Sequence, residues 1–310
     1  MLIFHDPQCA DYGSAMRPEQ PARLTRSAAY LRVTHPVWNF RLPPPVASAA
    51  QAIVQRAHTA EHLRRLNQPR DFDADTPFFP DIATHAWRAT SAALAAAEHA
   101  FTHRSPAFAL MRPPGHHATA DTAMGFCYLN SIAITALYAH HQLGVRRVAV
   151  WDFDAHHGNG TEEILRTELA ADPDAYFFTS VHQSPCYPGT GLVDAGPALR
   201  NWPIPPRCSR SQHLVALRAS LDAIIAYKPE LLLVSAGFDA YVGDPITAMT
   251  LEREDFAQLG VWLRELFQNH AIPAAGVLEG GYSSDLPVLI EAFLVAWSGI
   301  PGCAIPRSAP

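Results

Sequence analysis

The sequence predicts an α/β fold, with a mainly parallel sheet and helices on both of its faces. From residue 107 onward, short apolar stretches alternate with longer stretches of helical periodicity, which is typical of a parallel sheet. No linker rich in Gly, Ser or charged residues interrupts the 310 residues, so we expect one domain over 1–310. Within it, 1–46 is expected to be a capping segment and 300–310 a C-terminal tail.

The predicted elements follow this alternation along the chain. Helical spacing of apolar or alanine residues predicts helices over 18–32, 46–66 and 83–103, with a loop rich in Asp, Phe and Pro after the second. Short apolar runs then predict strands at 107–111, 148–153, 176–181, 231–235 and 274–278. The helices that alternate with them are predicted at 129–141, 161–169, 212–227, 253–269 and 286–297.

Charge and cysteine usage exclude several classes of function. A net charge of -6 and a pI near 6.2 provide no basic surface for nucleic acid or an anionic membrane. The five cysteines are scattered without a C-x-x-C pair, which is typical of a reducing compartment. No basic segment followed by an apolar core opens the chain, and no apolar run approaches about 18 residues. We therefore expect a cytoplasmic protein without membrane or nucleic-acid partners, and the oligomeric state stays open.

The strand at 148–153 ends in a dense cluster of ionisable side chains. Asp152, Asp154, His156 and His157 stand within six residues of one another, next to a run that reads as buried on both faces. Burying such groups unpaired would cost several kcal/mol. The alternative is a salt-bridged or capping cluster that starts the next helix. We favour a functional site, because four such groups occur together.

A polar signature directly follows every predicted strand. The carboxyl ends of parallel strands lie along one edge of a sheet, so these segments are expected to meet in one pocket. In chain order they are 112–117, 152–160, 180–182, 237–239 and 279–282.

The side chains at this edge are suited to hydrolysis of an amide. Asp154, His156 and Asp239 form a three-ligand set that suits Zn²⁺, or Fe²⁺ or Co²⁺, and leaves coordination positions open for water and a substrate carbonyl. His116 and His117, after a Pro-Pro-Gly turn, are candidates for acid/base work.

Two further side chains complete this interpretation. Asp152 could orient one of the paired histidines through its Nδ1 proton. Tyr282 follows two glycines and could donate a hydrogen bond to an oxyanion. A metal, a base and a neutral donor together predict a metal-dependent amide hydrolase.

Four motifs carry a specific resemblance. PPGHHA, DFDAHHGNG, SAGFDA and LEGGY, in this order and spacing, resemble the zinc-dependent histone deacetylase family over roughly residues 5–300. The LEGGY form is similar to its class II and bacterial deacetylase and acetylpolyamine amidohydrolase branch. The resemblance implies the arginase/deacetylase fold with an eight-stranded parallel sheet, so the five strands predicted from periodicity are an incomplete set.

The resemblance also implies roles for individual residues. The zinc ligands would be Asp154, His156 and Asp239. The general base would be His117, partnered by His116 on Asp152, and Tyr282 would polarise the carbonyl. The acyl-lysine tunnel would be walled by Phe126 and Tyr187, and the substrate-binding set is Gly125, Phe126, Tyr187, Ile246 and Gly280. A structural K⁺ would be held by the Asp152 side chain, the carbonyls of Asp154, His156 and Val181, and Ser180.

Departures from related patterns sharpen these expectations. Asn159 stands where class I enzymes carry an aspartate beside the second histidine, so His117 should have a less acidic neighbour. Arginases of the same fold bind two Mn²⁺ ions through carboxylates at the places of Gly158 and Tyr241, neither of which is a carboxylate here, so one metal per chain is expected.

The expected reaction is removal of acetyl or other acyl groups from lysine side chains of proteins or peptides. Polyamine-selective relatives have a glutamate where Ile246 stands, and an aliphatic side chain cannot pair with an ammonium group. Asp73 or Asp75 could restore such a contact, so an acetylpolyamine amidohydrolase acting on a small acylated amine is the first alternative. A catalytically silent acetyl-lysine-binding scaffold is the second.

Overall fold

Eight strands form one sheet at the centre of the molecule, in the order β2-β1-β3-β8-β7-β4-β5-β6. The computed structural model describes residues 1–45 and 48–299. All adjacent strands pair in parallel, which confirms the predicted α/β class and the eight strands that the family resemblance implies. The strands are β1 (Leu2–Phe4), β2 (Asn39–Arg41), β3 (Ala107–Ala109), β4 (Val148–Asp152), β5 (Tyr176–Gln183), β6 (Leu199–Ile204), β7 (Leu231–Ala236) and β8 (Ala274–Leu278).

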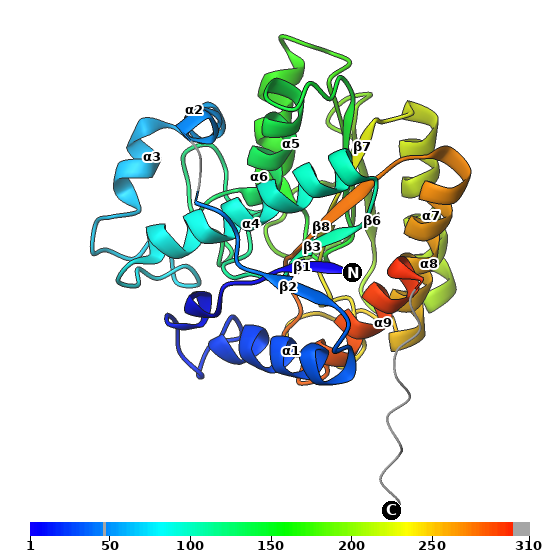
Figure 1. Ribbon diagram of the computed structural model, residues 1–310, viewed down its shortest axis with the longest axis horizontal. Helices are drawn as coiled ribbons and strands as arrows, with labels where there is room; N and C mark the ends of the chain where they lie inside the picture. The colour runs from blue at the N-terminus through cyan, green and yellow to red at the C-terminus, as the bar shows by residue number, and fades with distance from the viewer. Residues whose placement is uncertain (46–47, 300–310) are drawn as a thin grey trace, which may run out of the picture.

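Helices cover both faces of this sheet (Figure 1). Helices α4 and α5 pack on one face with α6 and α2 against α5, while α7 packs on the other face, where α8, α9 and α1 follow. The helices are η1 (Pro7–Ala10, a 3₁₀ turn), α1 (Pro21–Thr34), α2 (Ser48–Ala57), α3 (Ala60–Arg65), α4 (Ile82–His103), α5 (Ser131–His141), α6 (Asn159–Leu169), α7 (Arg210–Tyr227), α8 (Arg253–His270) and α9 (Leu286–Ser298). None of the described helices is long and apolar enough to cross a membrane.

The central strands are buried on both faces, as their continuous apolar sequences predict. Every residue of β4 and β7 is buried. The indole Nε1 of Trp151 in β4 donates to the Ser220 hydroxyl of α7 at 2.9 Å, so even the polar atom of this large side chain is paired. Any charge at the end of these strands is therefore enclosed by the protein.

Three strands are not predicted by periodicity. β1 and β2 have three residues each, too few for a pattern to emerge, and β6 contains Pro203 at the edge of the sheet. Because β1 and β2 both precede residue 46, the segment predicted to be a cap contributes two strands to the sheet.

The helix predicted over 46–66 is two helices. α2 ends at Ala57, and Thr59 begins α3 by accepting the His62 N–H at 3.2 Å on its hydroxyl. The Thr59 N–H donates to the Ala120 carbonyl at 2.8 Å, a contact with a distant loop that no local pattern reveals. Val46 and the tail 300–310 lie outside the described residues.

Candidate active site

The structure brings the predicted polar segments together at the carboxyl edge of the sheet. His116, which follows β3, has its Nδ1 3.0 Å from Asp152 Oδ2 at the end of β4. The Gly280 N–H, which follows β8, donates to Asp154 Oδ2 at 2.7 Å. Asp239, which follows β7, lies 2.8 Å from His156 Nδ1. Segments far apart in the sequence thus form one site.

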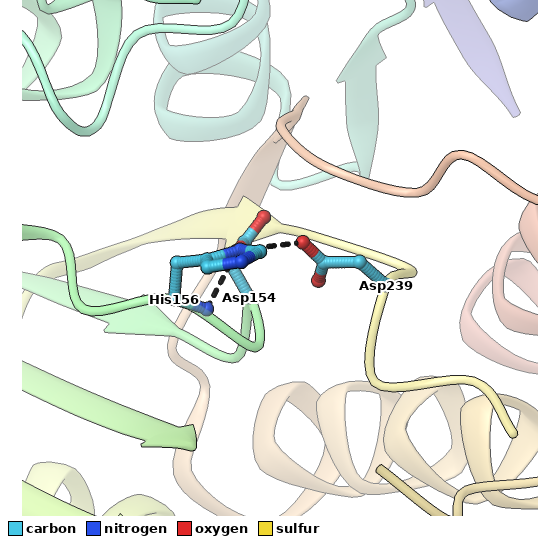
Figure 2. A group of neighbouring side chains, drawn as sticks. All are labelled: Asp154, His156 and Asp239. Atoms are coloured by element: carbon cyan, nitrogen blue, oxygen red, sulfur yellow. Dashed lines mark hydrogen bonds and ion pairs between the residues drawn. The ribbon is translucent and has the colours of Figure 1, made fainter. Parts of the chain in front are cut away.

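Three buried side chains that could bind a metal ion lie close together (Figure 2). They are Asp154, His156 and Asp239. One ligand atom from each lies within 4.8 Å of the others. The Nδ1 atom of His156 lies 3.2 Å from Asp154 Oδ1 and 2.8 Å from Asp239 Oδ2. Burial opposes a charge on this ring, yet the carboxylate of Asp239, aided by that of Asp154, outweighs it and raises the pKa of His156 well above its usual value. The same negative potential favours a divalent cation.

Glycines make room for these carboxylates. A Cβ at Gly237 would lie 2.0 Å from Asp154 Oδ2, and a Cβ at Gly280 would lie 2.3 Å from Asp239 Oδ2. No side chain can be built at either position without moving a proposed ligand. The two carboxylates and one imidazole suit a metal ion, and the space left by the glycines allows these ligands to lie close together.

The two adjacent histidines have different partners and different protonation. Burial disfavours a charge on His116, but the carboxylates of Asp154 and Asp152 outweigh it and raise its pKa to about 10. His117 Nδ1 lies 2.8 Å from Asn159 Oδ1, an amide oxygen as the sequence predicts. Burial, with His116 and His156 nearby, holds the pKa of His117 well below its usual value. His117 is therefore a neutral imidazole whose Nε2 can accept a proton.

A cavity of about 260 Å³ leads to these side chains. The ring of Phe126 lies 5.7 Å from that of Tyr282, and the ring of Tyr187 lies 5.1 Å from that of His117, measured between centroids. Gly125 has a φ of 57°, and a Cβ there would lie 2.4 Å from His117 Cδ2. The cavity is lined by Arg17, Pro18, Asp75, His117, Gly125, Phe126, His156, Cys186, Tyr187, Ile246 and Tyr282.

Tyr282 is held as a neutral donor at the base of this cavity. Burial raises the pKa of its phenol well above the usual value. The guanidinium of Arg23 lies 4.8 Å from the ring centroid and donates through Nε to the Gly281 carbonyl at 2.7 Å. A protonated phenol can donate a hydrogen bond to a carbonyl that gains negative charge.

Comparison with known proteins identifies the family of this chain. The histone deacetylase domain model matches residues 17–296. The chain belongs to the histone deacetylase family. It is 40% identical to an uncharacterized protein of Synechocystis sp. over 89% of this chain and 90% of that protein. It is 31% identical to a probable deacetylase of Archaeoglobus fulgidus, over 98% and 88% of the two chains.

A solved structure supports the same assignment. The acetylpolyamine aminohydrolase of Burkholderia pseudomallei superposes with a TM-score of 0.81 and 27% identity, over 97% of this chain and 99% of that one. Membership of the histone deacetylase family makes this protein a deacetylase or amidohydrolase, a hydrolase of linear amides. The family implies a divalent metal, for which Asp154, His156 and Asp239 are the candidate ligands.

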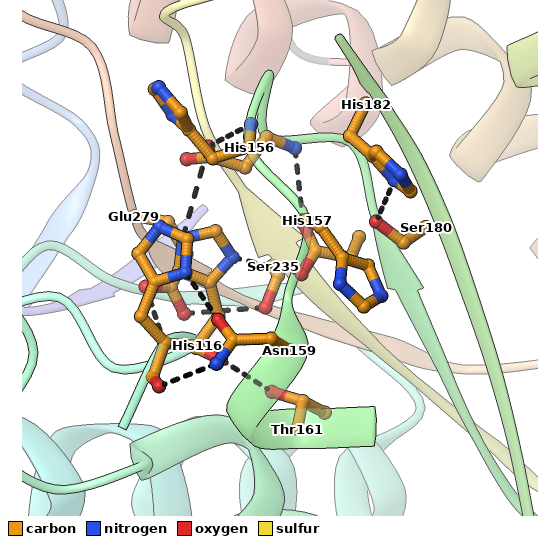
Figure 3. A network of polar contacts seen from close by, with 12 residues as sticks. His116, His156, His157, Asn159, Thr161, Ser180, His182, Ser235 and Glu279 are labelled. Carbon is orange, nitrogen blue, oxygen red and sulfur yellow. Dashed lines mark hydrogen bonds and ion pairs between the residues drawn. The ribbon is translucent and has the colours of Figure 1, made fainter. Parts of the chain in front are cut away.

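The remaining predicted residues lie around the metal set. Ser180 is opposite Asp152 in the β4–β5 pair, and its hydroxyl lies 2.9 Å from His182 Nδ1 (Figure 3). Val181 is fully buried. Gly280 lies behind the proposed ligands, where its N–H reaches Asp154, rather than among the residues that line the cavity. The K⁺ site stays a prediction.

Two buried carboxylates beside the site received no role from the sequence. Glu279 directly follows β8, the same signal that drew attention to Asp152 after β4. Asp244 lies in the loop after β7, between Asp239 and Ile246, the two residues of this loop with predicted roles. Neither the periodicity of apolar residues nor a family motif shows which groups the oxygens of these two carboxylates bind.

Proposed function

We propose that this member of the histone deacetylase family removes acetyl or other acyl groups from lysine side chains of peptides or proteins. The observation that supports it best is the composition of the cavity, with aromatic walls at Phe126 and Tyr187 and aliphatic Ile246 beside them. Such walls suit the methylene stem of an acylated lysine, whose amide is uncharged.

The side chains at the base of the cavity have complementary roles in this reaction. Neutral His117 takes a proton from the attacking water through Nε2, and Asn159 fixes that tautomer by accepting the Nδ1 proton. Tyr282 donates to the carbonyl oxygen as it gains charge. His116, held by Asp152 through its Nδ1, packs beside His117 with 4.0 Å between the ring centroids and is the partner of this base.

We further propose that Asp154, His156 and Asp239 hold Zn²⁺, with Fe²⁺ or Co²⁺ as substitutes, because two carboxylates and one imidazole suit these ions. When bound, the metal supplies Lewis acidity that activates water and polarises the amide. A structural K⁺ beside Asp152 and Ser180 belongs to the same proposal.

Charges at the mouth of the cavity support acyl-lysine over a polyamine. Ile246 cannot pair with an ammonium group. The exposed carboxylate of Asp75 lines the mouth, but so does the guanidinium of Arg17, whose Nη1 donates to the Ala74 carbonyl at 3.1 Å beside it. A cation next to the anion weakens the attraction for a second cation.

An acetylpolyamine amidohydrolase is the second candidate, because Asp75 does line the mouth and an acetylpolyamine aminohydrolase is structurally similar. The test compares kcat/KM for an N-ε-acetyl-lysine peptide with kcat/KM for acetylputrescine and acetylspermidine. We expect the peptide to be preferred. A preference of tenfold or more for the polyamines would favour the second candidate, and binding without turnover of any substrate would favour a silent scaffold.

A further inference from the structure

Glu279 and Asp244 are buried carboxylates that belong neither to the candidate metal set nor to the residues that line the cavity. Their exposed fractions are 0% and 7%. Burial raises the pKa of each carboxyl group to about 7, against the effect of backbone N–H groups that bind it. Carboxylates in such places are costly to bury, so their contacts need an explanation.

Glu279 holds the backbone just before His117. Its Oε2 accepts the N–H groups of both Gly115, at 2.7 Å, and His116, at 3.2 Å. Its Oε1 accepts the Ser235 hydroxyl at 3.3 Å, a contact that Figure 3 shows. One oxygen therefore holds the turn that carries the two histidines, and the other is anchored to the end of β7.

Asp244 holds the backbone of Tyr282. Its Oδ2 accepts the Tyr282 N–H at 2.8 Å, and its Oδ1 accepts the Ile246 N–H at 3.0 Å. Each oxygen serves one donor. The residue thus joins the proposed oxyanion donor to the loop that carries the cavity wall.

The two glycines before Tyr282 have no side chains and are held through their backbone, by the Gly280 N–H on Asp154 and by Arg23 on the Gly281 carbonyl. Gly281 has a φ of 114°, a conformation that residues with a side chain rarely adopt. The phenol must be placed within a fraction of an ångström of the carbonyl that it polarises. The contact with Asp244 extends the restraint of this segment to the backbone N–H of Tyr282 itself.

We propose that Asp244 and Glu279 are positioning residues for the hydrolysis, Asp244 for the phenol of Tyr282 and Glu279 for the pair His116 and His117. This inference rests on the roles that the proposed function gives these three side chains. Both carboxylates act through backbone N–H groups and contact no reacting atom.

One oxygen of Glu279 accepts both backbone N–H groups, whereas each oxygen of Asp244 accepts one. We therefore expect replacement of the carboxylate by an amide to disturb the contacts of Asp244 more than those of Glu279. In Glu279→Gln the amide oxygen can still accept both N–H groups, while the amide nitrogen meets the Ser235 hydroxyl, which can accept. In Asp244→Asn a single oxygen remains for two separate donors. The amide nitrogen of the asparagine, itself a hydrogen-bond donor, must then face the N–H of either Ile246 or Tyr282. That backbone N–H loses its acceptor.

The experiment compares these two variants in the metal-loaded full chain. Metal content, kcat and KM are measured with an acetyl-lysine peptide and acetylspermidine, and hydrogen exchange is followed at the amides of Gly115, His116 and Tyr282. We expect Asp244→Asn to retain metal, to lose about 10- to 100-fold in kcat and to exchange faster at Tyr282. Glu279→Gln keeps the acceptor and should stay within about threefold of wild type in kcat, with unchanged exchange at Gly115 and His116. Glu279→Met, a third variant of similar length without that oxygen, should lose about 10- to 100-fold in kcat and exchange faster at both amides.

A double-variant cycle separates positioning from a general structural role. In the Tyr282→Phe background, Asp244→Asn should cost little more in kcat, because its effect passes through the phenol. An equal cost in both backgrounds, or unchanged exchange at Tyr282, would overturn the role of Asp244. A kcat near wild type with unchanged exchange in Glu279→Met, or a loss above about tenfold in Glu279→Gln, would overturn that of Glu279. If wild type hydrolysed neither substrate, the proposed function would fail, while the exchange rates would still show whether each carboxylate holds its backbone amides.

Discussion

Two groups of buried histidines in this molecule have pKa values shifted in opposite directions. At the edge of the sheet, carboxylates outweigh the effect of burial and raise the pKa of His116 to about 10 and that of His156 well above its usual value. Away from the site, burial alone dominates. It lowers the pKa of His213 in α7 to about 4 and that of His58, which precedes α3, to about 3.

The difference shows that burial by itself makes a histidine neutral and that nearby carboxylates decide otherwise. His117 confirms this within the site, because its Nδ1 partner is the amide of Asn159 and its pKa is lowered. The site therefore combines a negative cluster suited to a cation with a neutral base beside it. Each prediction below changes one side of this contrast.

The largest effect is expected from removing any one of the three proposed metal ligands. Asp154→Ala, His156→Ala and Asp239→Ala should each abolish both turnover and metal retention, because three ligands are the minimum for a stable open site. Elemental analysis and a peptide deacetylation assay check this. Two tightly bound Mn²⁺ per chain, or full activity in a metal-free sample, would contradict the proposed single-metal site.

The next effect concerns the neutral groups of the site. Tyr282→Phe should keep the fold and the metal but lose about 10²- to 10³-fold in kcat, the scale of deleting one oxyanion donor. His117→Ala should be as severe, since His117 is the neutral imidazole at the base of the cavity. Steady-state kinetics at matched metal content tests both. A rate near wild type in either variant would show that the role assigned to that residue is wrong.

A smaller effect, on substrate preference, is expected from adding a negative charge at the mouth of the cavity. Ile246→Glu adds a carboxylate where a polyamine would place its cation, a charge-assisted contact worth about 10- to 100-fold in specificity. The ratio of kcat/KM for the acetyl-lysine peptide to that for acetylspermidine should fall accordingly. Ile246→Gln is the matched control, with similar size and no charge. An unchanged ratio in Ile246→Glu would place the cation of the polyamine elsewhere.

The smallest effect concerns stability at acid pH. The unfolded chain binds a proton at His213 near its usual pKa, whereas the folded chain does so only near pH 4. The unfolded state therefore holds more protons between these values. The His213 contribution to stability is present above about pH 6.5 and is lost as pH falls, by about 2 kcal/mol at pH 5.

His213→Leu removes this contribution. Neither ring nitrogen of His213 has a hydrogen-bond partner in the part of the chain that the structure describes, so an apolar side chain of similar size leaves no described contact unmade. Urea unfolding at pH 7 and pH 5 should show a smaller difference for the variant than for wild type. Val215→Leu, at an exposed position of the same helix, is the control and should behave like wild type. Equal differences in all three proteins would contradict the lowered pKa of His213.

Most of the central fold was predictable from the sequence because its signals are local. The strands β3, β4, β5, β7 and β8 are apolar or begin with an apolar run, as is typical of parallel strands covered on both faces. The strands β1, β2 and β6 are too short or too irregular to show such a pattern, and only pairing with their neighbours defines them.

The site divides in the same way. The sequence by itself determined which residue types stand at the carboxyl ends of the central strands, and four motifs identified the proposed metal ligands and the two histidines. Only the tertiary structure decided which backbone N–H groups reach Glu279 and Asp244 and which charges line the mouth of the cavity. A hydrogen bond between residues 164 positions apart, such as Gly115 to Glu279, depends on the relative placement of two strands, and no local sequence pattern contains that placement.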